Sequence, residues 1–309
     1  MRVAVVDCGT NTMRLLIADG DGIGPVAEVD RRLEFVRLGE GVDATGLFNP
    51  EALRRTFVAA ESYARVIAES QVDKVRFVAT SAARDVSNRG EFFAGIQSRL
   101  GVTPDVISGD EEAQLSFLGA LAGGPLGCDS AEPGVLVVDI GGGSTELIRG
   151  TASGQVREKT SLNMGSVRIR ERILRHDPPE ADEITAARAF VADLLDCCDV
   201  GLDGVTVCIG VAGTMTSLSG MNQGLAVYDR AAVHNSQMSV DDIESICDRL
   251  STLTVADTID QYPSLQPERA EVIATGALIC SEITRRTGRP MTVRETDILD
   301  GAASQLMRS

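Results

Sequence analysis

Two stretches of this chain place an aspartate, glycines and hydroxyl side chains at the end of an apolar run. Residues 3–12 read VAVVDCGTNT, with the aspartate at Asp7, and residues 135–144 read VLVVDIGGGS, with the aspartate at Asp139. Glycine has no Cβ, so successive backbone N–H groups can surround a phosphate oxyanion without steric hindrance. A carboxylate beside such a loop can hold a hard cation such as Mg²⁺ against the phosphate. The pattern therefore predicts phosphate chemistry.

The two stretches share one design and are spaced like two domains. Their aspartates are 139 − 7 = 132 residues apart, which is a domain-sized separation. In both cases an apolar segment follows the turn, so each stretch predicts a strand, a loop and a returning strand. A glycine run alone is also typical of a tight hairpin, and it is the repetition that favours two phosphate loops. Two such domains facing each other are expected to form a cleft that clamps a phosphate chain.

Four further motifs agree, and together with the loops they carry a resemblance to a known family. They are ATSAARDVSN at 79–88, SGDEEA at 108–113, NMGSVR at 163–168 and GVAGTMT at 210–216. The set resembles the acetate-kinase/sugar-kinase/Hsp70/actin superfamily and, within it, the exopolyphosphatase/guanosine pentaphosphate phosphatase (Ppx/GppA) family. The resemblance runs in order from residue 3 to about residue 301 and is strongest to the short actinobacterial type without a carboxy-terminal extension.

This resemblance implies an α/β fold of two duplicated ribonuclease-H-like (actin-like ATPase) domains facing across a cleft. We expect domain I over residues 1–122 and domain II over residues 123–309, with a final helix at about 297–309 packing back on domain I. Alternating strand and helix patterns agree with the α/β class. The expected strands lie at 75–79, 104–107, 135–150 (a hairpin), 156–162 and 205–209, with two short ones within 20–48. The expected helices begin near 49, 91, 109, 166, 182, 239, 268 and 297.

The resemblance assigns phosphate binding to both loops and to a third turn. Arg84, which we expect in a loop just past a strand, is similar to the family arginine that grips the terminal phosphate. The turn at 210–214 is expected to line the far side of the cleft. The residues implied to bind phosphate or substrate are Gly9, Thr10, Asn11, Thr12, Arg84, Gly141, Gly142, Gly143, Ser144, Gly213 and Thr214.

Three carboxylates are candidates for the metal. Asp139 is the first expected ligand, because Mg²⁺ combines one or two carboxylates with phosphate oxygens and water. Glu146, two residues past Ser144, is either a second carboxylate that acts through water or a solvated hairpin residue. Asp7 holds the place of Asp139 in the first loop, and the same choice applies to it.

Glu112 is the candidate general base. A carboxylate can orient and deprotonate water for in-line attack on a terminal phosphorus. Glu111 and Glu112 point in different directions on a helix. Paired acids at a helix start are also common as first-turn residues that the helix dipole favours, and this is what we expect of Glu111. The assignment of the base to Glu112 follows from the resemblance, because Glu112 precedes Ala113 as in the family.

The composition excludes several classes of protein and indicates the cellular location. The net charge of −16 argues against a nucleic-acid partner and requires polyanion binding to be local and helped by a cation. No apolar run has the length of a membrane span. Seven cysteines without a Cys-x-x-Cys pair indicate reduced thiols and a cytoplasmic location.

These observations predict an Mg²⁺-dependent exopolyphosphatase that releases orthophosphate from the end of inorganic polyphosphate, with a preference for short chains. The first alternative is a guanosine pentaphosphate phosphohydrolase, and the second is a non-catalytic polyphosphate or nucleotide sensor. Binding of ATP, ADP or guanosine pentaphosphate in the cleft and a homodimer are further expectations that follow from the relatives.

Overall fold

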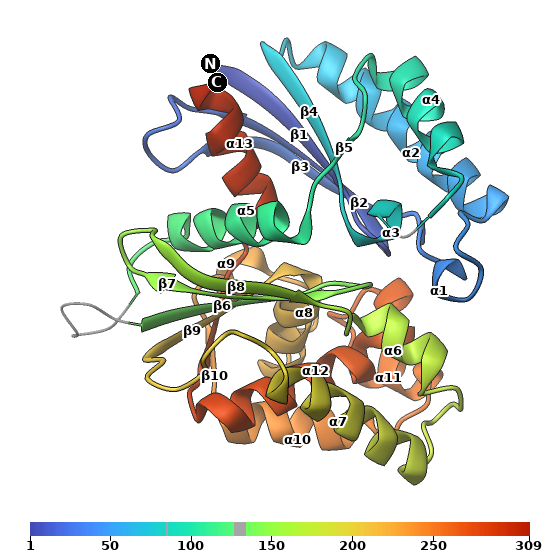
Figure 1. The fold of residues 1–309 in the computed structure, drawn as a ribbon, viewed down its shortest axis with the longest axis vertical. Coiled ribbons are helices and arrows are strands. Elements are labelled where there is room, and N and C mark those ends of the chain that lie inside the picture. The colour runs from blue at the N-terminus through green and yellow to red at the C-terminus, as the bar shows by residue number, and fades with distance from the viewer. Residues whose placement is uncertain (85, 127–133) are drawn as a thin grey trace. The chain divides into compact units, whose positions relative to one another are not determined.

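The chain folds into two α/β units, each built on one mixed sheet (Figure 1). The computed structural model describes residues 1–84, 86–126 and 134–309. Unit 1 comprises Met1–Ala122 with Asp297–Ser309, and unit 2 comprises Gly123–Thr296. The predicted α/β class is confirmed. Most of the loop expected at 123–134 lies outside the described residues.

The sheet of unit 1 has the order β3-β2-β1-β4-β5. Strands β1 and β2 form an antiparallel hairpin that β3 extends, and β4 and β5 run parallel to β1. Successive side chains of a strand point to opposite faces, and both faces are covered here, which explains the uninterrupted apolar run of β1. The bounds are β1 (Arg2–Cys8), β2 (Thr12–Asp19), β3 (Ala27–Phe35), β4 (Lys74–Ala79) and β5 (Asp105–Val106).

Helices cover the two faces of this sheet in pairs. Alternate β1 residues Ala4 and Val6 belong to the core under α2 (Pro50–Glu69) and α4 (Arg89–Leu100). Val3 and Val5 belong to the core under α5 (Gly109–Ala122) and α13 (Ile298–Arg308). Two short helices, α1 (Val42–Thr45) and α3 (Ser81–Arg84), complete the unit.

Two glycines let α13 pack tightly on α5. A Cβ at Gly119 would lie 1.7 Å from the carbonyl oxygen of Asp297, and one at Gly301 would lie 2.0 Å from that of Leu115. The backbones of the two helices therefore approach so closely that no side chain fits between them at these points. This contact holds the carboxy-terminal helix within unit 1.

The sheet of unit 2 has the order β10-β11-β9-β6-β7-β8. Its helices bury one continuous apolar cluster with the sheet. The strands are β6 (Gly134–Ile140), β7 (Thr145–Thr151), β8 (Val156–Leu162), β9 (Val207–Val211), β10 (Gln237–Met238) and β11 (Met291–Val293). The helices are α6 (Ser166–Arg172), α7 (Ala181–Asp196), α8 (Ala212–Asn222), α9 (Arg230–Val233), α10 (Val240–Leu250), α11 (Val255–Gln261), the short 3₁₀ helix η1 (Pro267–Arg269) and α12 (Ala270–Thr287).

The two units are built on one plan. In each, a three-stranded antiparallel meander (β1-β2-β3 or β6-β7-β8) joins two strands parallel to its first strand (β4 and β5, or β9 and β11). The duplication expected from the two loops is thus present in the strand order itself.

Three local predictions are wrong. Residues 20–48 contain one strand, β3, rather than two, and the chain then forms α1. The glycine-rich turn at 210–214 is instead the end of β9 and the start of α8, whose residues Met215, Leu218 and Met221 are buried on one side. Arg84 ends the helix α3 and does not lie in a loop.

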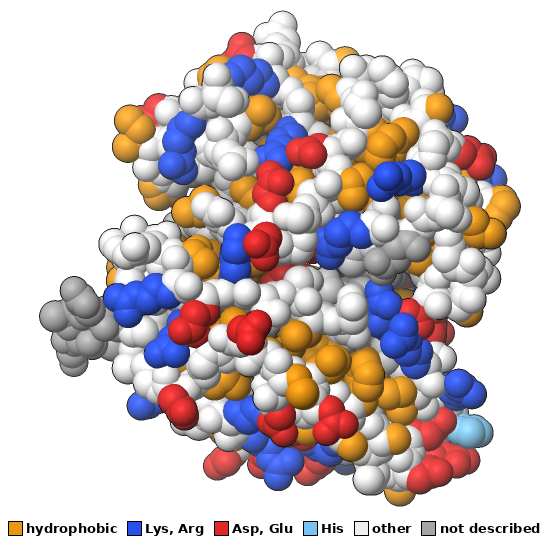
Figure 2. Space-filling model, in the orientation of Figure 1, with side chains coloured by type: hydrophobic (Ala, Val, Ile, Leu, Met, Phe, Trp, Pro, Cys, Tyr) orange, Lys and Arg blue, Asp and Glu red, His pale blue; other side chains and the backbone are white. Residues whose placement is uncertain are grey.

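Charged side chains of both signs are visible on one face of the molecule (Figure 2). Acidic and basic side chains are interspersed on the face drawn in Figure 2. Within the described part of the chain, no helix is long and apolar enough to cross a membrane.

Candidate active site

In unit 1 the predicted site residues follow three adjacent parallel strands. Loop 9–12 follows β1, α3 with Arg84 follows β4, and α5 with Glu112 follows β5. Because parallel strands end at the same edge of a sheet, these segments are neighbours, at the position where α/β sheets commonly bind ligands.

Glu112 and Arg84 form a direct ion pair. Arg84 Nη1 donates to Glu112 Oε2 at 2.7 Å and to the carbonyl oxygen of Ile107 at 3.1 Å. Glu112 is 8% exposed. Glu111 instead accepts from Arg76 at 2.7 Å, and its side chain is 41% exposed. The two neighbouring glutamates thus differ in partner and burial, as the helical geometry predicts.

The first phosphate loop is closed by one backbone bond and tied to α3. The N–H of Gly9 donates to the carbonyl of Thr12 at 2.9 Å. The hydroxyl of Thr10 lies 2.9 Å from that of Ser81, the first residue of α3. Asn11 contributes its carbonyl oxygen, which accepts the N–H groups of Val36 and Arg37 at 3.1 and 2.8 Å.

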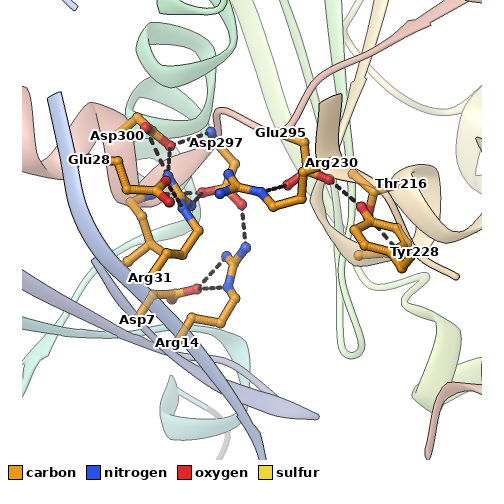
Figure 3. A network of polar contacts seen from close by, with 12 residues as sticks. Asp7, Arg14, Glu28, Arg31, Thr216, Tyr228, Arg230, Glu295, Asp297 and Asp300 are labelled. Atoms are coloured by element: carbon orange, nitrogen blue, oxygen red, sulfur yellow. Dashed lines mark hydrogen bonds and ion pairs between the residues drawn. The ribbon is translucent and has the colours of Figure 1, made fainter. Parts of the chain in front are cut away.

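Asp7 belongs to a buried ionic network that also includes residues of α13 (Figure 3). Arg14 Nη2 donates to Asp7 Oδ2 at 2.6 Å, and Arg14 Nη1 bonds Asp297. Arg31 joins this network through Asp300 at 2.9 Å and through Glu28 at 2.8 Å. Asp7 Oδ1 is buried and accepts no hydrogen bond from the part of the chain that the structure describes.

The charges of this network do not balance. Asp7, Glu28, Asp297 and Asp300 provide four carboxylates, and Arg14 and Arg31 provide two guanidinium groups. Burial raises the pKa of Asp7 against the opposing effect of Arg14. Burial also raises the pKa of Asp300, whereas Arg14 and Arg31 outweigh burial and lower the pKa of Asp297.

The second phosphate loop repeats the first. The N–H of Gly141 donates to the carbonyl of Ser144 at 3.0 Å, as Gly9 does to Thr12. The loop joins β6 to β7, and the register pairs Asp139 with Glu146, as it pairs Asp7 with Arg14 in unit 1.

Glu146 is a buried carboxylate. It is 1% exposed, and the hydroxyls of Ser144 and Ser161 both donate to its Oε1 at 2.7 Å. The alternative of a solvated hairpin residue is therefore wrong. Asp139, 7% exposed, lies opposite on the neighbouring strand, and directly opposed residues of an antiparallel pair share one face. The two carboxylates thus lie on one face of the hairpin, next to the loop.

Gly213 and Thr214 lie in the first turn of α8, beside the second loop. The hydroxyl of Thr214 donates to the carbonyl of Ile140 at 3.0 Å. A Cβ at Gly213 would lie 2.0 Å from a guanidinium nitrogen of Arg269, so this glycine makes room for that arginine. Ala212 before it has φ 64°, an uncommon conformation for a residue with a Cβ.

Comparison with known proteins agrees with this geometry. The family model described as the Ppx/GppA phosphatase family matches residues 16–288. The chain belongs to the Ppx/GppA family. It is 44% identical to Exopolyphosphatase 2 of Mycobacterium tuberculosis, over 99% of this chain and 98% of that protein. The recognition of the family from its motifs is confirmed.

Other relatives and structures of the family extend this similarity. The chain is 33% identical to a bifunctional 3-dehydroquinate synthase/phosphatase of Fusobacterium nucleatum, over 97% of this chain and 46% of that protein. The crystal structure of an exopolyphosphatase-like protein superposes with a TM-score of 0.93 at 39% identity, covering 100% of this chain and 99% of the other. A Ppx/GppA protein of Aquifex aeolicus superposes with a TM-score of 0.82 at 26% identity, covering 100% and 98%.

The Ppx/GppA chain offers donors that fit Mg²⁺ as a partner of phosphate. Among the described residues no group of three or more His, Cys, Asp or Glu side chains is arranged to hold a metal ion. Asp139 and Glu146 present hard carboxylate oxygens beside the second predicted phosphate loop, and Asp7 presents a buried oxygen to which no described residue donates a hydrogen bond. Mg²⁺ rarely uses an all-protein cage, so one or two carboxylates completed by phosphate and water suit it.

Three residues beside the predicted site were missed from the sequence. Arg14 binds Asp7, Ser161 binds Glu146, and Arg269 lies against Gly213. A signal for Arg14 exists, because a hairpin closed by a four-residue turn pairs residues 7 and 14. Ser161 and Arg269 approach the site from other elements, and their spacing in the sequence carries no signal.

Proposed function

We propose that this protein is an Mg²⁺-dependent exopolyphosphatase that hydrolyses the terminal phosphoanhydride of inorganic polyphosphate. The ion pair of Glu112 and Arg84 beside a phosphate loop carries the proposal. It places a buried carboxylate and a guanidinium group at the strand ends of one unit. The full-length similarity to an exopolyphosphatase supports the same substrate class.

In the proposed reaction Arg84 changes partner. A terminal phosphate competes with Glu112 for the guanidinium group of Arg84, because arginine forms bidentate hydrogen bonds with phosphate oxygens. Glu112 then accepts a proton from water, whose oxygen attacks the terminal phosphorus in line. The bridging P–O bond breaks, which yields orthophosphate and a chain shorter by one phosphate. The leaving phosphate is weakly basic, so no strong general acid is needed.

The loops and carboxylates hold the substrate in this scheme. The backbone N–H groups of Gly9–Thr12 and Gly141–Ser144 bind phosphate oxygens, with Gly213 and Thr214 adding contacts. Asp139 and Glu146, with a contribution from Asp7, would hold Mg²⁺, which would supply positive charge to neutralise the phosphates.

Several finer features belong to the same proposal. The net charge of −16 repels the distal part of a long polyanion, so we propose a preference for short chains.

Nucleotides such as ATP, ADP and guanosine pentaphosphate bind through the same loops. The six described cysteines are all free, which supports a cytoplasmic location. A homodimer is proposed by analogy with relatives.

The decisive experiment measures phosphate release with Mg²⁺ from short polyphosphate, long polyphosphate, ATP and guanosine pentaphosphate, side by side. Glu112→Gln removes the base and keeps the size, so turnover should fall roughly 10²–10⁴-fold while binding persists. Glu111→Gln is the matched control and should keep activity. Loss of activity in Glu111→Gln with retention in Glu112→Gln would reverse the assignment. Faster release from guanosine pentaphosphate than from polyphosphate would favour the alternative substrate.

A further inference from the structure

The first turn of α6 holds the carbonyl groups of the second phosphate loop. The N–H groups of Ser166 and Val167 donate to the carbonyls of Gly141 and Gly142, each at 2.9 Å. The next carbonyl, that of Gly143, accepts from the side chain of Arg168, whose Nε lies 2.8 Å away. All three glycine carbonyls of the loop are therefore turned toward this helix.

This arrangement orients the N–H groups of the loop. In a trans peptide the C=O of one residue and the N–H of the next point in opposite directions. With the three carbonyls directed at α6, the N–H groups of Gly142, Gly143 and Ser144 are directed away from it. Within the described residues these three N–H groups donate no hydrogen bond. Consecutive N–H groups directed to one side form a cradle for an oxyanion.

The close approach of α6 depends on Gly165. A Cβ at this position would lie 2.2 Å from the carbonyl oxygen of Gly142 and 2.4 Å from the carbonyl carbon of Gly143. Both atoms are backbone, so they cannot move aside like the end of a side chain. The NMGSVR motif at 163–168 thus contains the residues that support the loop.

We infer that Arg168 is a positioning residue, which fixes the peptide between Gly143 and Ser144 so that the Ser144 N–H faces the substrate phosphate. Of the three loop carbonyls, that of Gly143 is held by a charged side chain, whereas that of Gly141 accepts from the Ser166 hydroxyl at 3.3 Å. A cationic donor also polarises the peptide it binds, which strengthens the N–H on its other side. The inference deepens the proposed function and rests on it for the identity of the ligand.

The test compares Arg168→Lys with the matched control Arg172→Lys, at an exposed position on the same helix. Lysine keeps the charge and loses the Nε donor. Hydrogen–deuterium exchange is measured for the peptides covering 139–146 and 163–169, with kcat and KM for short polyphosphate and inhibition by orthophosphate. A hydrogen bond to a charged donor contributes about 1.5–3 kcal/mol, so kcat/KM should fall roughly 10–100-fold, mainly through kcat.

In Arg168→Lys we expect faster exchange in both peptides and weaker orthophosphate inhibition, with neither change in Arg172→Lys. Unchanged exchange, or full activity in Arg168→Lys, overturns the inference, since charge alone would then suffice. A parent enzyme that fails to release phosphate from polyphosphate refutes the proposed function. If exchange still accelerates in Arg168→Lys, support of the loop by Arg168 stands independently of the substrate.

Discussion

The hairpin β1–β2 of unit 1 and the hairpin β6–β7 of unit 2 share strand, turn and register but differ at the residue opposite the aspartate. Asp7 faces Arg14, and Asp139 faces Glu146. The Asp7–Arg14 pair is a close ion pair, with 2.6 Å between Oδ2 and Nη2. Opposed like charges on a sheet are destabilising by themselves. The same motif thus places a guanidinium group opposite the aspartate in unit 1 and a second carboxylate opposite it in unit 2.

The two loops also differ in what supports them from behind. In both units the segment after the third strand donates N–H groups to the loop carbonyls. In unit 1 this segment is irregular, and Val36, Arg37 and Gly39 are the donors. In unit 2 it is the first turn of a helix and the Arg168 side chain. The segment that donates to the loop carbonyls has kept its position after the third strand in both units, but its structure differs. We therefore expect the second loop to have the more rigid backbone.

The largest expected effect is a difference between Asp139 and Asp7 variants in the Mg²⁺ concentration that activity requires. Asp139→Asn should raise the Mg²⁺ concentration for half-maximal activity by at least about 10-fold, since even indirect partners of a metal are worth that much. Asp7→Asn should raise it less, because Arg14 already offsets the charge of Asp7. The measurement is phosphate release titrated with Mg²⁺, with excess chelator as the zero point. Equal shifts in the two variants would remove the proposed distinction, and full activity of the parent in chelator would exclude a metal role.

The second prediction concerns folding stability. Arg14→Gln leaves Asp7 and Asp297 without their shared guanidinium, and breaking a buried ion pair in this way costs about 3–5 kcal/mol of unfolding free energy. Glu146→Gln removes one of two opposed carboxylates and keeps an acceptor for Ser144 and Ser161, so in chelator it should be neutral or stabilising. Urea unfolding of both variants checks the contrast. The double variant Arg14→Gln/Asp7→Asn should recover part of the loss, and no recovery would show that the pair is not coupled.

The third prediction compares the glycines behind the two loops. Gly165→Ala forces a Cβ against backbone atoms of Gly142 and Gly143, and overpacking of this kind costs typically 1–3 kcal/mol. Gly39→Ala meets the side-chain Cγ2 of Thr10 at 2.2 Å, which a rotamer change can relieve in part. Thermal unfolding should therefore show the larger loss for Gly165→Ala. A larger loss for Gly39→Ala would mean that the first loop is the stiffer one.

The smallest expected effect is a pH dependence of folding stability that arises from Asp7 in unit 1. Burial raises the pKa of Asp7 above its ordinary value of 3.8, so the folded chain binds this proton more tightly than the unfolded chain. The contribution of Asp7 to stability must then decline as pH rises from 3.8 through the raised pKa. Urea unfolding between pH 4 and pH 7 should show a shallower decline in Asp7→Asn than in the parent. An identical slope in both would assign the pH dependence to other groups.

Much of the fold was predictable because local signals and the repeat agreed. Asn49 caps α2 by accepting the N–H of Glu51 at 2.9 Å, and Ser239 and Asp242 form the expected capping box of α10. Gly101 ends α4 in the left-handed conformation that favours glycine. The start of α8 was mistaken for a turn, because glycine and threonine are weak helix formers and burial in the core outweighs that propensity.

The sequence by itself determined the two loops and their aspartates, because the apolar run, the aspartate and the glycine turn occur twice at a domain-sized spacing. Only the tertiary structure decided that Glu112 binds Arg84, that Asp297, the N-cap residue of α13, binds Arg14, and that α6 orients the second loop. These contacts join residues far apart in sequence through packing of glycine surfaces and parallel strand ends. Such packing depends on shape complementarity between distant segments, which no local pattern of residues encodes.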